Sequence, residues 1–220
     1  MGYHILTPHQ SQVVDAVQQC EEIIRWYTFT GGTALSEVYL QHRLSEDLDF
    51  FTRSPVMDHK INAFIDKAKA TIGYTSYEKR VYSGLFMYTL TFPDDDRLKL
   101  DFNEYDFPPV ERGTKLGKLD VDSIFDIAVN KLEAILSRAK VRDFVDLYFA
   151  IPAIGCDLDQ VRMRLADKFS GIRDDEEVVR HLVKVVDFTD YPQMLVPFDR
   201  QKMVDFFLAE AKKLEHKIFK

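Results

Sequence analysis

The hydrophobic pattern changes its period near residue 120, and this change restricts the possible folds more than any other feature. Before it, short segments rich in aromatic and β-branched residues predict strands at 26–30, 47–52, 74–82, 84–92 and 97–102. Helical spacing predicts helices at 8–25, 33–44 and 58–70. After it, helical patterns follow one another at 121–138, 142–152, 158–169, 175–186 and 200–217. The expected fold class is therefore α/β (α+β), a small mixed-sheet core followed by a helical C-terminal half.

The stretch 104–119 is the expected boundary between these halves. It contains Pro108, Pro109, Gly113 and Gly117, which interrupt regular structure. We therefore expect an α/β core at 1–110 and a helical domain at 111–220 that packs on it.

Composition narrows the class of protein further. The net charge of -7 argues against nonspecific coating of nucleic acid, which needs many Lys and Arg contacts to phosphate, but it leaves room for a local basic patch. Two cysteines, Cys20 and Cys156, have neither metal-site spacing nor a disulfide framework, so a reducing cytoplasm is expected. The N-terminal residues do not resemble a signal peptide, and no apolar run approaches the ~20 residues of a membrane span. We expect a cytoplasmic protein with no membrane partner.

Two aspartates stand one residue apart in the predicted strand 47–52. Side chains alternate faces along a strand, so Asp47 and Asp49 share one face while Leu48 and Phe50 point into the core. Two carboxylates about 7 Å apart form a hard-oxygen site of the kind Mg²⁺ prefers. The alternative is a polar edge strand with solvated acids.

A glycine pair precedes the predicted helix 33–44. Gly31, Gly32 and Thr33 lie between a strand and this helix, where glycines expose backbone N–H groups and the helix dipole favours a phosphate. The Thr33 hydroxyl could donate to that phosphate. The segment is neither a Walker loop nor a dinucleotide fingerprint. The alternative is an ordinary glycine turn with Thr33 as the helix N-cap.

Strand 97–102 offers a third acid. Leu98, Leu100 and Phe102 lie on its apolar face, and Asp101 is the one acid on the other, exposed face. If this strand joins the same sheet, Asp101 could serve as a general base or a further metal ligand. The alternative is a surface ion pair with Lys99 or Arg97.

The helical half contains a lysine on an apolar stripe. Lys131 falls among the buried positions of helix 121–138, where its ammonium either snorkels to water or meets an anion such as a nucleotide triphosphate. In the phosphate-binding role, replacement of Lys131 by Met should preserve the melting temperature.

A basic cluster follows at Arg138, Lys140 and Arg142. Asp143 and Asp146 lie one helical turn apart beside it. A position near a helix N-terminus and an Arg142–Asp146 pair explain these acids structurally, as an alternative to a functional role.

Together these segments resemble a known family. "GGTAL", "HRLSEDLDFF" and "NKLEAILSRAKVRDFVDLY" are similar to the AbiEii/AbiGii toxin family of nucleotidyltransferase-like proteins, within the DNA polymerase β-like nucleotidyltransferase superfamily. The resemblance covers most of residues 28–150, with the later helices matching in general character. It implies a nucleotidyltransferase core as the mixed-sheet half.

The resemblance also implies roles for individual residues. It implies that Gly31, Gly32 and Thr33 contact nucleotide phosphates, and that Asp47 and Asp49 coordinate Mg²⁺ or Mn²⁺. Lys131 matches the lysine expected near the triphosphate. Arg43 and Ser45 match residues that support the acid pair, and Arg142, Asp143 and Asp146 belong to the late motif. Asp101, as a catalytic residue and metal ligand, is assigned from strand phase and superfamily analogy.

The function expected from this resemblance is metal-dependent transfer of a nucleoside monophosphate from an NTP to an acceptor. The expected acceptor is RNA, with the 3′ end of tRNA as one candidate and a protein hydroxyl as the alternative. A cognate antitoxin is an expected partner. Two alternatives stay open. The chain could be a nucleotide-binding or interaction module without turnover, or an NTP-dependent phosphotransferase that acts on a protein or a small molecule.

Overall fold

The computed structural model describes residues 4–169, 171 and 173–218, and in it the chain forms two compact units. The first unit contains the residues up to Pro108 together with Arg112–Ser123. The second contains Pro109–Glu111 and the residues from Ile124 onward. Each unit is described by itself.

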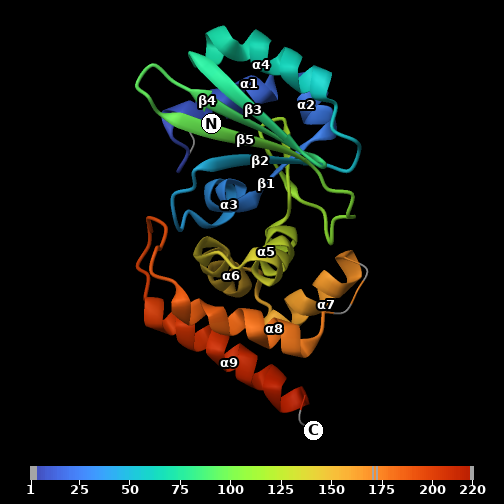
Figure 1. Cartoon of the computed structure of the whole chain (residues 1–220), viewed down its shortest axis with the longest axis vertical. Helices are drawn as coiled ribbons and strands as arrows, with labels where there is room; N and C mark the ends of the chain where they lie inside the picture. The colour runs from blue at the N-terminus through green and yellow to red at the C-terminus, as the bar shows by residue number, and fades with distance from the viewer. Residues whose placement is uncertain (1–3, 170, 172, 219–220) are drawn as a thin grey trace. The chain divides into compact units, whose positions relative to one another are not determined.

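The first unit is a mixed sheet with helices on both faces (Figure 1). Among the described residues the sheet has seven strands in the order β3-β4-β5-β2-β1-β7-β6. The strands are β1 (Thr28–Thr30), β2 (Asp47–Thr52), β3 (Ser76–Tyr82), β4 (Leu85–Thr91), β5 (Arg97–Glu104), β6 (Thr114–Leu116) and β7 (Leu119–Val121). The β2–β5 and β1–β7 pairs are parallel and the others are antiparallel. The α/β class with a mixed sheet is confirmed.

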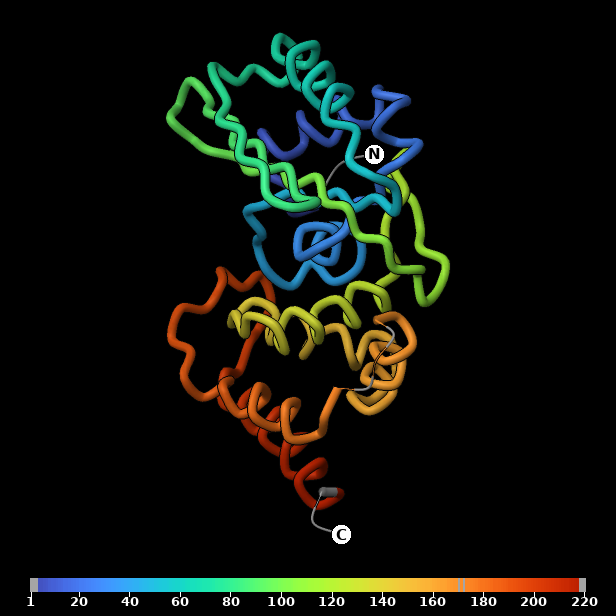
Figure 2. The backbone as a smooth tube through the Cα atoms, turned by 45° about the vertical axis from the view of Figure 1, so that its right-hand side comes forward, coloured from blue at the N-terminus to red at the C-terminus, as the bar shows by residue number. Residues whose placement is uncertain are grey.

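Helices α1 (Pro8–Gln18), α2 (Glu21–Trp26) and α4 (Asp58–Ile72) lie on one side of this sheet (Figure 1). On that side, stacked Phe50 and Phe102 fill the core, and the hydroxyl of Tyr88 donates to Asn62 of α4. The helical segment 31–40 lies on the other side of the sheet (Figure 2). Apolar side chains of the sheet therefore point toward α4. The residues that alternate with them along β2 and β5 point toward the helical segment 31–40.

Three predicted boundaries in this unit are wrong. The helix predicted at 8–25 is broken after Gln18, and α2 replaces the start of the strand predicted at 26–30. The helix predicted at 33–44 starts earlier, as α3 (Gly31–Ala34), continues as the π-helix η1 (Leu35–Leu40), and stops because Gln41 adopts a left-handed conformation.

The hairpin β6–β7 was not predicted, and it lies where the sequence indicated only a linker and the start of helix 121–138. Gly117, with φ +60°, allows its tight turn, and Lys115 pairs with Asp120 across it at 2.6 Å. A two-residue turn between such short strands gives little periodic signal.

The second unit is helical among its described residues. Its elements are α5 (Ile124–Arg138), α6 (Val141–Ile154), α7 (Leu158–Lys168), α8 (Asp175–Leu182), the 3₁₀-helix η2 (Val183–Asp187) and α9 (Arg200–Ile218). Helix α5 packs against α6 and α7, and α8 packs against α9. The ring of Phe144 contacts Phe188 and Phe207 in its core. No helix in the described part of the chain is long and apolar enough to cross a membrane.

Candidate active site

Strand β2 is an interior strand of the sheet, held between β5 and β1. Leu48 and Phe50 are fully buried on one of its faces. Asp47 and Asp49 are half-buried on the other face. The alternative of a polar edge strand with solvated acids is therefore wrong, and the two carboxylates face the same side as predicted.

Strand β5 adds two more charges to this face. It runs parallel to β2 with Asp101 directly opposite Asp49 and Lys99 directly opposite Asp47. Asp101 is 9% exposed, so the prediction of an exposed face is wrong. Strands β4 and β2 flank β5 on both sides, and Met87 of β4 lies opposite Asp101. The parallel register thus brings Asp47, Asp49, Lys99 and Asp101 together.

Lys99 joins the two strands electrostatically. Its Nζ lies 3.0 Å from Oδ2 of Asp47 and 3.0 Å from Oδ2 of Asp101. Burial lowers the pKa of the Lys99 ammonium, but the negative charges of Asp101 and Asp47 outweigh it and hold the pKa above its ordinary value. Lys99 is therefore a cation at neutral pH. From the sequence we expected Lys99 only as a surface partner of Asp101, although its position in the strand already put it on the same face as that acid.

Gly31 lies against the carboxylate of Asp49. Its φ of +76° is strained for other residues, and a Cβ built on it would lie 2.2 Å from Oδ2 of Asp49. A Cβ on Gly32 would lie 2.3 Å from Nη2 of Arg43 and 3.1 Å from Oγ of Ser45. Gly31 therefore combines a left-handed backbone with close approach of Asp49, whereas a side chain at Gly32 would require the end of Arg43 to shift. This explains the glycine pair without a bound ligand.

Thr33 has a different place from the one predicted. Thr30 is the N-cap residue of α3, so Thr33 is inside the helix and the N-cap alternative is wrong. The Thr33 hydroxyl is buried and donates to the backbone carbonyl of Asp47. This hydrogen bond ties the helix to β2 and uses the one hydrogen that the hydroxyl can donate.

The segment before β2 is held by two buried side chains. Nη1 of Arg43 donates to the carbonyl of Leu44 at 2.8 Å. Nε2 of Gln10, from α1, donates to the carbonyl of Ser45 at 2.7 Å. Gln10 was not predicted, because it is far away in sequence and its helix gives no sign of its partner.

The remaining predicted residues lie in the second unit. Nζ of Lys131 lies 2.9 Å from Oδ1 of Asp143 and 2.6 Å from Oδ2 of Asp146, and both acids are fully buried. The Lys131 side chain is 9% exposed, so the snorkelling alternative is wrong. Arg138 also pairs with Asp143, at 3.2 Å. Lys131, Asp143 and Asp146 form a buried charged cluster, and exposed Arg138, exposed Lys140 and half-buried Arg142 lie next to it.

The acidic face has the donor chemistry of a Mg²⁺ site. Mg²⁺ is usually held by one or two carboxylates together with substrate phosphates and water. Asp47 and Asp49 supply two such carboxylates on one strand. No group of three or more potential ligands is arranged for a metal among the described residues. The donor set therefore fits a cation that arrives with phosphate oxygens.

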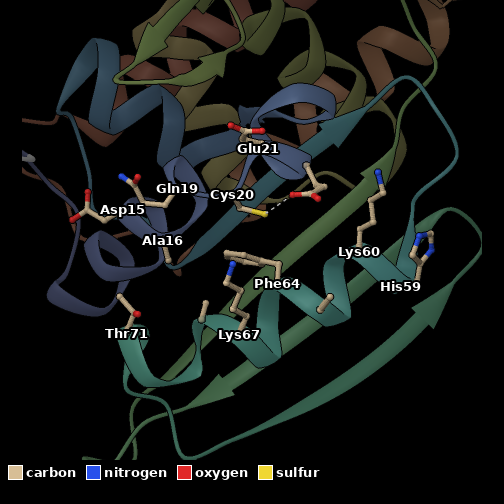
Figure 3. Close-up of a pocket in the computed structure, with 13 residues that line it drawn as sticks. Asp15, Ala16, Gln19, Cys20, Glu21, His59, Lys60, Phe64, Lys67 and Thr71 are labelled. Atoms are coloured by element: carbon tan, nitrogen blue, oxygen red, sulfur yellow. Dashed lines mark hydrogen bonds between the residues drawn. The ribbon is translucent and has the colours of Figure 1, made fainter.

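A separate pocket of about 740 Å³ lies on the opposite side of the sheet, between α1, α2 and α4 (Figure 3). Asp15 and Glu21 line it from α1 and α2, while Lys60 and Lys67 line it from α4. None of the predicted site residues contributes to it. This pocket is therefore separate from the acidic face of the sheet.

The fold defines the class of protein. The chain is similar to the solved structure "putative nucleotidyltransferase from H. pylori", with a TM-score of 0.62 and 21% identity over 96% of this chain and 97% of that chain. It is similar to JHP933 from Helicobacter pylori as well, with a TM-score of 0.62 and 22% identity over 95% and 91% of the two chains. These likenesses show a nucleotidyltransferase fold.

The sequence comparison gives the family. The family model for the AbiEii toxin, a nucleotidyl transferase of type IV toxin–antitoxin systems, matches residues 20–216. The chain belongs to the AbiEii nucleotidyltransferase toxin family, as its resemblance predicted. It is also 33% identical over 162 residues to the uncharacterized protein aq_aa25 of Aquifex aeolicus (strain VF5), covering 71% of this chain and 72% of that protein.

Proposed function

We propose that this protein transfers a nucleoside monophosphate from an NTP to an RNA acceptor in a reaction that requires a divalent metal. One observation supports it most strongly: the Gly31 backbone lies against Asp49, and Asp47, Asp49 and Asp101 share one face of the sheet. A phosphate-binding loop and an acid pair are the two parts that nucleotide transfer needs in contact with each other.

The roles of the residues follow from their chemistry. Asp47 and Asp49 would hold Mg²⁺ or Mn²⁺, which would neutralise the triphosphate and favour departure of pyrophosphate. Gly31 and Gly32 let phosphate oxygens approach the backbone, and Asp101 is the proposed general base for the acceptor hydroxyl. In the second unit, Lys131 is proposed as a nucleotide-binding residue and Arg142, Asp143 and Asp146 as accessory residues, the roles that the family resemblance implies.

The acceptor and the partner are the finer parts of the proposal. We place RNA first because the basic cluster Arg138, Lys140 and Arg142 stands out in a chain of net charge -7. The 3′ end of tRNA is the first acceptor to test. The protein belongs to a toxin family, so a cognate antitoxin is its proposed partner, and a reducing cytoplasm is its proposed location.

The position of a radiolabel tests the reaction. We expect α-labelled NTP to label an acceptor in total RNA in the presence of Mg²⁺, and γ-labelled NTP not to do so. Label transferred from the γ-position would identify a phosphotransferase instead. No transfer from either position, with NTP still bound, would identify a binding module without turnover.

Variants connect the reaction to the acidic face. Asp47→Asn and Asp49→Asn should each abolish labelling while the protein stays folded, because they keep the size of the side chain and remove the charge that holds the metal. Asp106→Asn, at an exposed acid outside the sheet, is the matched control. Mg²⁺-dependent labelling that survives in either β2 variant would place the site elsewhere.

A further inference from the structure

Lys99 lies where a positive charge is needed in the acidic face. Its ammonium contacts one carboxylate on each of two neighbouring strands at 3.0 Å, and its side chain is 29% exposed. The parallel register of β2 and β5 sets Lys99 opposite Asp47. Asp101 is the next residue on the same face of β5. The contact is therefore a property of the sheet rather than of a mobile surface side chain.

The same carboxylates are the proposed metal ligands. A divalent ion and an ammonium cannot both occupy the space between two carboxylate oxygens, and each repels the other at short range. A metal that binds to Asp47 must therefore displace or share the Asp47–Lys99 contact. This competition would weaken the binding of metal alone, whereas a metal bound to a triphosphate brings extra ligands and negative charge to which Lys99 could turn.

We propose that Lys99 is a built-in counter-cation of the acidic face, which holds Asp47 and Asp101 in place before metal binds and makes metal binding depend on the nucleotide. This role rests on the proposed function, since it assumes that Asp47 holds the metal. Lys99 is a positioning residue in this account: it acts through the two carboxylates.

Metal affinity without turnover tests the proposal. Binding of Mn²⁺ to the full chain is measured by electron paramagnetic resonance, first without nucleotide and then with a non-hydrolysable NTP. Lys99→Met should bind Mn²⁺ alone about tenfold more tightly than the wild type, a factor in the ordinary range of coupling between two sites. The non-hydrolysable NTP should improve Mn²⁺ affinity less in this variant than in the wild type.

Three further variants separate this role from simple packing. Lys99→Arg keeps the charge and should behave like the wild type. Lys115→Met removes the exposed partner of Asp120 on β6 and should leave Mn²⁺ affinity unchanged. Lys99→Gln, which can still donate to a carboxylate, serves if Lys99→Met does not fold.

Thermal unfolding gives a second readout. Without metal, Lys99→Met should melt at a lower temperature than the wild type, because the ammonium that contacts both Asp47 and Asp101 is gone. Saturating Mn²⁺ should raise its melting temperature by more than it raises that of the wild type. A purely structural lysine would give equal Mn²⁺-induced shifts.

The outcomes distinguish this inference from the function on which it rests. Unchanged or weaker Mn²⁺ affinity in Lys99→Met and Lys99→Gln, with metal-dependent labelling intact in the wild type, overturns the role of Lys99 and leaves nucleotidyl transfer standing. Absence of Mn²⁺ binding by all variants with and without NTP, together with absence of transfer, overturns both.

Discussion

At the scale of single residues, two glycines with similar backbone angles have very different surroundings. Gly31 (φ +76°) lies against Asp49, whereas a Cβ on Gly73 (φ +83°) would meet nothing within 4 Å. Both positions carry the same cost of a left-handed conformation for a side chain, about 1–2 kcal/mol. Only Gly31 adds a collision with a site residue.

The pair Gly31→Ala and Gly73→Ala therefore isolates the contact with Asp49. Both variants should lose stability, but only Gly31→Ala should also lose NTP binding and nucleotide transfer, because its methyl group displaces the Asp49 carboxylate. Chemical denaturation and equilibrium binding of a labelled NTP measure the two effects. Equal NTP affinity in the two variants would show that the approach of Gly31 to Asp49 has no part in binding.

Lys131 is the residue whose expected behaviour the structure changes most. The sequence led us to expect that Lys131→Met would preserve stability. Because Lys131 neutralises two fully buried acids, its removal should instead cost about 3–5 kcal/mol of unfolding free energy. Urea denaturation measures this cost.

Two companion variants check the cause. Adding Asp143→Asn and Asp146→Asn to Lys131→Met should recover part of the loss, because it removes the two buried charges that Lys131 contacts. Lys213→Met, at an exposed lysine paired with Glu210, should change stability little. A stable Lys131→Met protein would mean that the second unit does not depend on this cluster.

At the scale of elements, a polar group links helix α4 to the hairpin β3–β4. Asp58, at the start of α4, accepts from Lys79 of β3, and so does Asn62. The hydroxyl of Tyr88 on β4 shares its one hydrogen between the same two acceptors. The hydrogen bond from Lys79 outweighs the opposing effect of burial and lowers the pKa of Asp58 below its ordinary value of 3.8. The ionised carboxylate is thus favoured in the folded state.

The lowered pKa of Asp58 makes a pH-dependent contribution to the free energy of unfolding, and its sign follows from the direction of the shift. A lowered folded-state pKa stabilises the protein above the ordinary pKa, and the contribution is lost as the pH falls from 3.8 through the folded pKa. Asp58→Asn should therefore cost up to about 1 kcal/mol near pH 7, since the pair is partly exposed, and progressively less below pH 3.8. Urea titrations across this range measure it.

Asp66→Asn, at an exposed acid on the same helix, is the control. This variant makes the same Asp-to-Asn replacement and leaves the contact between Lys79 and Asp58 in place. A cost for Asp58→Asn that does not shrink with acid would assign the effect to hydrogen bonding rather than to charge.

At the scale of the whole molecule, the chain is acidic overall but carries a local basic cluster, Arg138, Lys140 and Arg142. If RNA is the acceptor, its phosphates must meet positive charge somewhere. Lys140 and Arg142 are the better probes of the cluster, because Arg138 also pairs with the buried Asp143. Changing Arg138 would mix RNA binding with stability.

Replacement of Lys140 and Arg142 by Ala should weaken RNA binding and reduce the slope of log affinity against log salt by about 1.4, the value for two contacts to a single strand. Lys202 and Lys212, both exposed on α9, give a control with the same change in net charge. Fluorescence anisotropy at several salt concentrations measures both. Equal slopes in the two double variants would favour a protein hydroxyl or a small molecule as the acceptor.

The sequence by itself determined the features that depend on local pattern. Alternation in "DLDFFT" placed Asp47 and Asp49 on one face of a strand, and the change of period separated the sheet from the helices. The motifs together identified the family. These predictions succeed because side-chain period and short motifs are properties of neighbouring residues.

Only the tertiary structure decided which charges meet. The contact of Lys99 with Asp47 depends on the register between β2 and β5, which are separated by a helix and a hairpin in the chain. Lys131 forms ion pairs with two acids on the next helix. Gly31 lies against the carboxylate of Asp49, 18 positions away in the sequence. A local pattern states which way a side chain points, but strand register and helix packing determine what it meets there, because burial of the whole core selects them.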